Sequence, residues 1–153
     1  MAWSASNISA AMVSNFFAPA QALSWSADTI NVALYNNSIT PNKNDTFANN
    51  SYNAGQWANT NEVSQVGQWA AGGVALSTKT NTFGSGTQQV SAANTASGSA
   101  ATLSGVFGCL VYDNSLTAKS AFCWNYFGGT QSVTSGTFTV VWSGSGILQF
   151  TIT

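Results

Sequence analysis

The sequence contains very little charge. Only 5% of its 153 residues are charged, against about a quarter in ordinary soluble domains. It has no arginine and no histidine, and its charges are three lysines and four carboxylates. Without histidine, the usual general base near neutral pH is missing. A nucleophilic cysteine would also need an activating base, and none stands near Cys109 or Cys123. We therefore expect no catalytic residues and no enzymatic activity.

The same scarcity weighs against several kinds of ligand. Three scattered lysines cannot neutralise a useful number of phosphates, so we expect no nucleic-acid partner. Without histidine and with only two cysteines, the sequence predicts no metal site, and no motif indicates a cofactor. No run of apolar residues approaches the length of a membrane span. The first residues lack the basic and apolar regions of a signal peptide, which favours synthesis and retention in a cytoplasm.

Cys109 and Cys123 are the only cysteines. If residues 106–112 and 120–127 pair around the loop 113–119, the two side chains face each other across a hairpin. A disulfide is then geometrically conceivable. In a cytoplasmic product, two free and buried thiols are the favoured interpretation.

Aromatic and uncharged polar residues supply what charge does not. Asn, Ser and Thr make up roughly a third of the chain, and 6 Trp, 4 Tyr and 9 Phe accompany them. This aromatic content is typical of a folded chain. The length fits one domain over 1–153, with an N-terminal arm and helix over 1–28 and a β-sandwich over 29–153. A surface with little charge suits permanent burial against neighbouring subunits, although some free-standing β proteins are also poor in charge.

Residues 7–18 carry the only convincing helical pattern. Asn7 or Ser6 can cap its start, and Pro19 ends it. An apolar stripe recurs at every fourth position. Its members are Ile8, Met12 and Phe16. This stripe can pack on the sheet of its own domain or on a neighbouring subunit, and we favour its own sheet.

The rest of the chain alternates apolar and polar residues, as strands do. Strands are predicted over 29–35, 73–77, and 78–83 or 87–91, with hairpins 103–112/121–127 and 137–142/147–153. A small, polar segment over 92–101 is expected to be a flexible crossing. The last hairpin is apolar on both faces, so one face should meet the core and the other a helix or a subunit. The predicted fold is therefore mainly β, an antiparallel β-sandwich resembling a jelly roll, with a short N-terminal helix.

A long, Asn-rich loop over 41–62 is the most unusual segment, since loops of this length often have a function. Aromatic side chains in or beside it could stack on sugars or anchor a protein interface. Ordinary packing against the sandwich is equally open. Together with the helical stripe and the N-terminal arm, these aromatics make up the candidate interface or binding residues. They are Trp3, Ile8, Met12, Phe16, Tyr52, Trp57 and Trp69.

Several phrases, read in order, carry a resemblance. They are NVALY (31–35) with NSITP (37–41), NEVS (61–64) with WAAGGVAL (69–76), VYD (111–113), and FGGTQSVTSGTFTV (127–140) with SGIL (145–148). In this order they resemble a family of small all-β structural proteins of tailed bacteriophages, encoded among head and tail genes.

The resemblance implies a structural protein of the virion, made in the cytoplasm of a bacterial host. A capsid decoration or cement protein is the favoured role, with copies of itself, commonly as a trimer, and the major capsid protein as partners. The alternative is a tail or adsorption-fibre subunit that binds a host receptor or glycan through the aromatic loop. The family offers no catalytic, cofactor or metal-binding residues to carry over.

Overall fold

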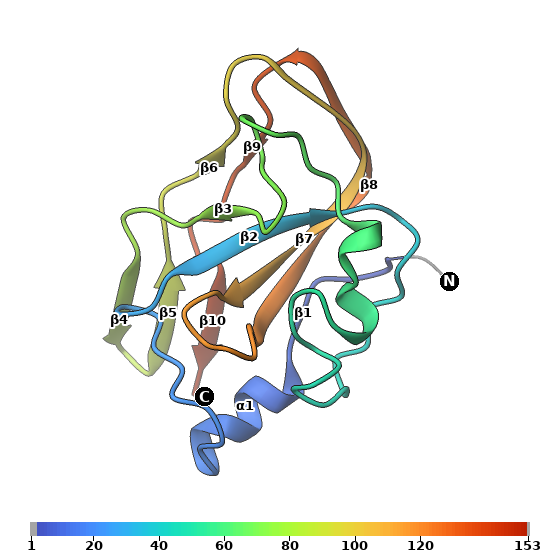
Figure 1. Ribbon diagram of the computed structural model, residues 1–153. Coiled ribbons are helices and arrows are strands. Elements are labelled where there is room, and N and C mark those ends of the chain that lie inside the picture. The colour runs from blue at the N-terminus through green and yellow to red at the C-terminus, as the bar shows by residue number, and fades with distance from the viewer. Residues whose placement is uncertain (1–2, 153) are drawn as a thin grey trace.

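The computed structural model describes residues 3–152 and shows a chain that is mainly β, with antiparallel sheets and one short helix (Figure 1). The predicted fold class is confirmed. These residues form three sheets: one of five strands, one of three and one of two.

The five-stranded sheet is the centre of the fold, with the order β1-β8-β7-β2-β3. Its strands are β1 (Asn7–Ile8), β8 (Ala121–Gly136), β7 (Ala101–Asp113), β2 (Ile30–Tyr35) and β3 (Val74–Ala75). The predicted hairpin of β7 and β8 is confirmed, and β8 runs well beyond the predicted end at 127. Most residues of that extension are small or polar and only partly buried or exposed, so the sequence lacks the apolar alternation that marks a half-buried strand.

The three-stranded sheet has the order β10-β5-β4, and the two-stranded sheet pairs β6 with β9. Their strands are β4 (Thr80–Gly84), β5 (Thr87–Ser91), β6 (Thr95–Ala96), β9 (Thr139–Val140) and β10 (Leu148–Thr151). Both alternatives predicted for the segment 78–91 are therefore strands. The segment 92–101 is not wholly a flexible crossing, because it contains β6 and the first residue of β7.

The predicted hairpin of 137–142 with 147–153 is wrong. β9 pairs with β6, and β10 pairs with β5. A tight turn does join the two segments, since the Gly146 N–H donates to the Ser143 carbonyl at 2.8 Å. The strands beyond this turn diverge into different sheets, because each finds its partner earlier in the chain.

The helix α1 (Ala10–Phe17) begins later than predicted. Ser9 is its cap, with its Oγ accepting from the Met12 N–H at 3.4 Å, so neither Asn7 nor Ser6 has that role. Asn7 and Ile8 instead form β1, paired with β8. The backbone of these two residues is held extended by the sheet, and the helix can start only after it.

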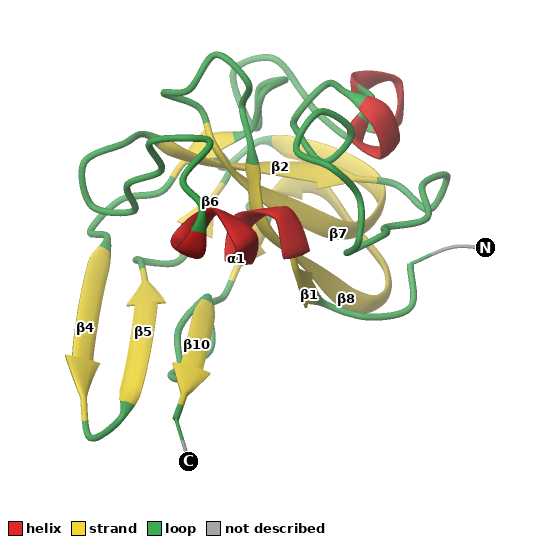
Figure 2. Ribbon diagram, turned by 90° about the horizontal axis from the view of Figure 1, so that it is seen from below, coloured by secondary structure: helices red, strands yellow, loops and turns green. Residues whose placement is uncertain are grey.

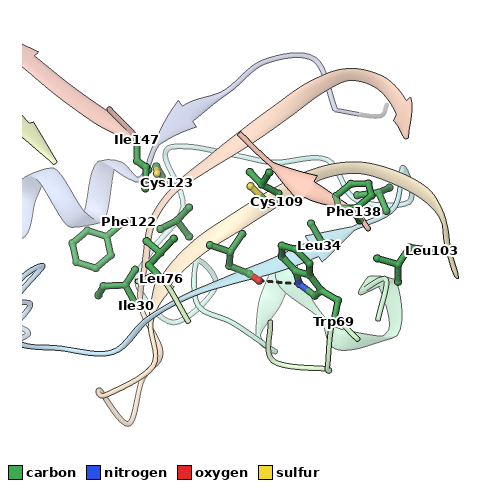
Figure 3. Packing of buried hydrophobic residues seen from close by; sticks show 14 of the residues in the cluster. Ile30, Leu34, Trp69, Leu76, Leu103, Cys109, Phe122, Cys123, Phe138 and Ile147 are labelled. Atoms are coloured by element: carbon green, nitrogen blue, oxygen red, sulfur yellow. Dashed lines mark hydrogen bonds between the residues drawn. The ribbon is translucent and has the colours of Figure 1, made fainter. Parts of the chain in front are cut away.

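Two groups of buried side chains cover the two faces of the central sheet. On one face, α1 and the smaller sheets enclose an apolar cluster that Figure 3 shows in part. It includes Met12, Ile30, Leu34, Trp69, Leu103, Val111, Phe122 and Phe138. In Figure 2 the short helical turns of the 41–62 loop, η1 (Gly55–Trp57) and η2 (Asn59–Asn61), lie on the other side of the sheet. The long loop is thus a layer of the structure.

Trp57 is the centre of this second layer and is fully buried. Its indole N–H donates to the Asn50 Oδ1 at 2.6 Å, and its carbonyl accepts from the Tyr35 hydroxyl at 2.7 Å. The rings of Trp3 and Tyr35 meet it edge-on, with centroids at 5.6 and 5.2 Å. Gly55 lets the loop turn tightly above it, since a Cβ there would lie 2.5 Å from the Asn49 carbonyl oxygen.

We expect Trp57→Ala to lower the free energy of unfolding by about 3–5 kcal/mol, the usual cost of truncating a buried aromatic side chain. Urea unfolding followed by tryptophan fluorescence measures this. Phe17→Ala is the control, because Phe17 is 87% exposed and its truncation should change stability little. Equal effects of the two substitutions would contradict the loop's role as a structural layer.

Candidate functional site

An open apolar groove lies between α1, the 23–26 loop and the three-stranded sheet. Its volume is about 570 Å³, within the usual range for pockets that take a small ligand or a partner's side chains. Its lining residues are Met12, Val13, Phe16, Phe17, Leu23, Ser24, Trp25, Ser26, Asn81, Gln88, Val90, Phe122, Leu148 and Phe150. None of them is charged and most are apolar, so a partner entering the groove meets mainly apolar surface.

The helix supplies one wall of the groove and splits the predicted stripe. Ile8 lies in β1 and is half-buried, and Met12 is fully buried in the core. The favoured packing of the helix on its own domain is therefore confirmed for Met12. Phe16 and Phe17 remain 57% and 87% exposed. Phe16 meets the Phe150 ring edge-on at 6.2 Å, which ties the end of the helix to β10.

The three-stranded sheet supplies the opposite wall through one of its faces. Cross-strand register places Asn81, Val90 and Leu148 in one row and Phe83, Gln88 and Phe150 in the next. Because side chains alternate between faces along a strand, the other face carries the remaining residues. They are Thr80, Thr82, Gly84, Thr87, Gln89, Ser91, Gln149 and Thr151. The sheet is thus apolar toward the groove and polar on its outer side.

Hydrogen bonds to Asp28 and Lys79 hold the loop that carries Trp25. The Asp28 carboxylate accepts from the Ser24 N–H at 2.7 Å. The Lys79 ammonium donates to the carbonyls of Trp25, at 2.8 Å, and of Asp28. Trp25 itself packs edge-on against Phe122 at 5.5 Å. Two of the few charged side chains of the protein thus fix a wall of the groove.

Asp113, at the end of β7, is buried beside Asp28. Burial, followed by the neighbouring Asp28 carboxyl, raises the pKa of Asp113 to about 6. One of its oxygens accepts from the Ser115 N–H at 2.9 Å. The loop behind the groove is therefore anchored beside a buried carboxyl group, that of Asp113, whose pKa lies above that of a free aspartate.

The raised pKa of Asp113 makes the stability of the fold depend on pH. The folded-state pKa of Asp113 lies above the value of about 3.9 in an unfolded chain, so folding favours the protonated form. This contribution to folding stability is fully present below about pH 4 and is lost as the pH rises through about 6.

We expect Asp113→Asn to remove this loss of stability with rising pH while keeping the bond to Ser115. Urea unfolding of both proteins between pH 4 and 7 measures it, with Asp45→Asn as a control at another, partly exposed carboxyl group. Parallel curves for the protein and Asp113→Asn would contradict the assignment.

The structure turns all three of the candidate tryptophans inward. Trp57 and Trp69 are fully buried, and the Trp69 indole N–H donates to the Val32 carbonyl at 3.1 Å (Figure 3). A ligand cannot reach either ring, so the hypothesis of an exposed tryptophan contact in the loop is wrong. Trp3 is also buried, against Trp57. The polar surroundings of these residues in the sequence had favoured neither packing nor exposure.

Tyr52 is the only aromatic candidate in the loop that is not fully buried. Its ring stacks on Tyr112 at 4.7 Å, and its hydroxyl donates to the Glu62 carboxylate at 2.8 Å. The other Glu62 oxygen accepts from the Gly72 N–H at 2.8 Å, and the Lys119 ammonium lies 5.3 Å above the Tyr52 ring. These contacts fasten the loop to the sheet, and they occupy the atoms through which Tyr52 would hold a ligand.

Sequence reasoning missed Phe17, Leu148 and Phe150 as site residues. The two apolar faces of the predicted last hairpin were the signal for Leu148 and Phe150, since an unexplained apolar face marks a contact. Phe17 adjoins the helical stripe but does not share its spacing. The groove could not be assembled from these signals, because the helix and the three-stranded sheet that form its opposite walls lie more than 60 residues apart in the chain.

The two cysteines are free and buried, so the favoured interpretation is confirmed. Cys109 pairs with Asn125 and Cys123 with Val111, which sets the two thiols diagonally rather than opposite each other. Burial raises the pKa of Cys109 to about 12 and also raises the pKa of Cys123. Because the thiolate is the nucleophile, neither thiol is activated at neutral pH.

We expect the native protein to resist Ellman's reagent at pH 8 and to release two equivalents of thiol when it is denatured without a reductant. A Ser145→Cys variant, placed in the exposed turn before β10, is the positive control and should react at once. Two thiols that react rapidly in the native state, or none in the denatured state, would contradict buried and reduced cysteines.

Across residues 3–152, no group of three or more His, Cys, Asp or Glu side chains is placed to hold a metal ion. Within the same residues, no helix has the length and apolar character needed to cross a membrane. Comparison of the chain with protein-family models, curated proteins and solved structures finds no match.

Proposed function

We propose that the chain is a structural protein of a tailed-bacteriophage virion, a capsid decoration or cement protein made in the cytoplasm of the host. Its partners are further copies of itself and the major capsid protein. The observation that carries the proposal is the apolar groove flanked by Phe16 and Phe17, on a chain with almost no charge.

Burial of this groove against a partner is favourable because it covers apolar surface and removes no charged side chain from water. Covering a fully exposed phenylalanine contributes about 1.5–3 kcal/mol, and Phe17 is nearly fully exposed. Desolvation costs little, because the lining contains no charged side chain. Contiguous exposed apolar surface of this kind marks interaction sites in folded proteins.

The virion setting rests on the resemblance of the sequence phrases. NVALY lies in β2 and VYD ends β7, and these strands are neighbours in the central sheet, with Asn31 opposite Tyr112. The phrases thus belong to the segments that build the core, which supports a shared fold. The surface that would distinguish one role on the particle from another lies elsewhere, in the groove.

The alternative is a tail or adsorption-fibre subunit that recognises a receptor or glycan through the aromatic loop. Burial of Trp57 and Trp69 removes the side chains that were to make this contact. No other contact of the loop favours a ligand, so the decoration role is the one we develop.

We expect Phe17→Asp to bind particles at least tenfold more weakly than the unchanged protein, because it places a charge in the apolar contact. Phage heads lacking the protein are mixed with each variant, and bound protein is measured after sedimentation. Val66→Asp is the matched control, since Val66 is 95% exposed and does not line the groove. Thermal unfolding should show both variants folded.

Heads reconstituted with the protein should withstand higher temperature than bare heads or heads mixed with Phe17→Asp. Equal binding by Phe17→Asp and the unchanged protein would overturn the role of the groove. Bare particles that keep their heat resistance but fail to adsorb to cells would overturn the decoration role in favour of the fibre.

A further inference from the structure

The strand β4 forms an open edge of the three-stranded sheet. All five of its residues are exposed, and in the described part of the chain β5 is its only partner. Figure 2 shows this sheet extending away from the central sheet, with β4 on its outer side. An open edge presents unpaired N–H and C=O groups, which another strand can satisfy.

The phase of the hydrogen bonds follows from the turn between β4 and β5. Ser85 and Gly86 have φ of 50° and 74°, as in the two-residue turn that makes the flanking residues a hydrogen-bonded pair. Gly84 is therefore bonded to Thr87, and Thr82 and Thr80 also point their backbone groups toward β5. The backbone groups of Asn81 and Phe83 point outward, to the open edge.

Nothing along β4 blocks a second strand. Natural edges are commonly protected by charge, proline or a bulge, and β4 contains none of the three. The nearest charge is Lys79, whose ammonium is turned to the carbonyls of Trp25 and Asp28. Its side chain therefore braces the groove and does not protect the edge.

We propose that two copies of the chain pair through β4, antiparallel across a two-fold axis at Thr82, so that their three-stranded sheets become one of six. The backbone groups of Asn81 in each copy then form hydrogen bonds with those of Phe83 in the other copy. Shifting the axis to Asn81 or Phe83 would pair residues beyond the ends of β4, such as Lys79 or Ser85. The axis at Thr82 is thus the register that uses the whole strand.

The side chains match in this register. Phe83 is 71% exposed, and it lies on the apolar face of the sheet, beside the partner's Asn81. The apolar faces of the two copies become continuous, and each exposed Phe83 gains a neighbour. Thr82 stands opposite its own copy on the polar face, and threonine pairs are favourable across strands. With three lysines and four carboxylates per chain, repulsion between copies is slight.

This inference deepens the proposed function and rests on it, because it names the copy-to-copy contact of a subunit proposed to assemble. A two-fold contact makes a dimer, whereas the phage resemblance implies a trimer. The two differ in mass.

A cysteine at position 82 tests the register directly. Opposite residues in a pair that is not hydrogen-bonded have Cα atoms about 4.5 Å apart, close enough for a disulfide. We expect Thr82→Cys to give a covalent dimer under mild oxidation. Thr80→Cys is the matched control, because the two copies of position 80 would lie about 14 Å apart, four residues at about 3.4 Å each. The native cysteines are buried and do not compete.

Light scattering of the unmodified protein should give the mass of a dimer as concentration rises. Phe83→Pro should stay monomeric and folded, because proline there removes an outward N–H and an exposed ring and is tolerated at an edge. A trimer or a monomer at every concentration, equal cross-linking of both cysteine variants, or a dimer unaffected by Phe83→Pro would overturn the β4 contact. The particle-binding assay is independent, because Phe83 does not line the groove: Phe83→Pro that still binds heads leaves the proposed function standing without this contact. A dimer that binds no heads leaves the contact without that function.

Discussion

The burial of β2 on both faces is the constraint on which the rest of the fold depends. All six of its residues are buried, so the central sheet needs a cover on each side. One cover is the conventional one, made of α1 and the smaller sheets. The other is the 41–62 loop, which has little regular structure but places Trp57 on the sheet. Such a loop can be a layer only if its buried polar groups find partners, and the amide of Asn50 provides them by bonding to Trp57, Gln56 and Ser9.

Amides and hydroxyls do throughout this protein what charges do in most others. Asn15 closes the end of α1 by accepting from the N–H groups of Ala20 and Gln21, and Asn31 bonds to the Gly72 carbonyl beneath the loop. Uncharged groups are cheaper to remove from water than ions. A surface stabilised in this way can be covered by a partner at little desolvation cost, so the same composition serves the interior and the interfaces.

Local patterns predicted the elements that are held by near neighbours in the chain. The alternation in 29–35 and the hairpin of β7 and β8 are examples, because each is decided by residues close in sequence. The final hairpin could not be predicted for the opposite reason: β9 and β10 pair with residues of β6 and β5 that lie 43 to 64 positions earlier. The exposure of individual side chains could not be predicted either. Met12 and Phe16 share one face of a helix, yet only Met12 reaches the core, whereas Phe16 lies at the open groove. The spacing of apolar residues in one segment does not show how far the layer that packs against it extends.

The residues that stabilise the fold and the residues proposed for assembly lie in different parts of the structure. The doubly covered sheet contains Tyr35 and the cysteines, and its covers contain Trp57 and Trp69, so a substitution there acts on folding. The groove and the open edge of β4 both belong to the three-stranded sheet, which is covered on one face only and in part. Phe17 and Phe83 can therefore change without opening a cavity in the core. A subunit whose contacts lie on its least covered sheet can bind through them without disturbing the layers that keep it folded.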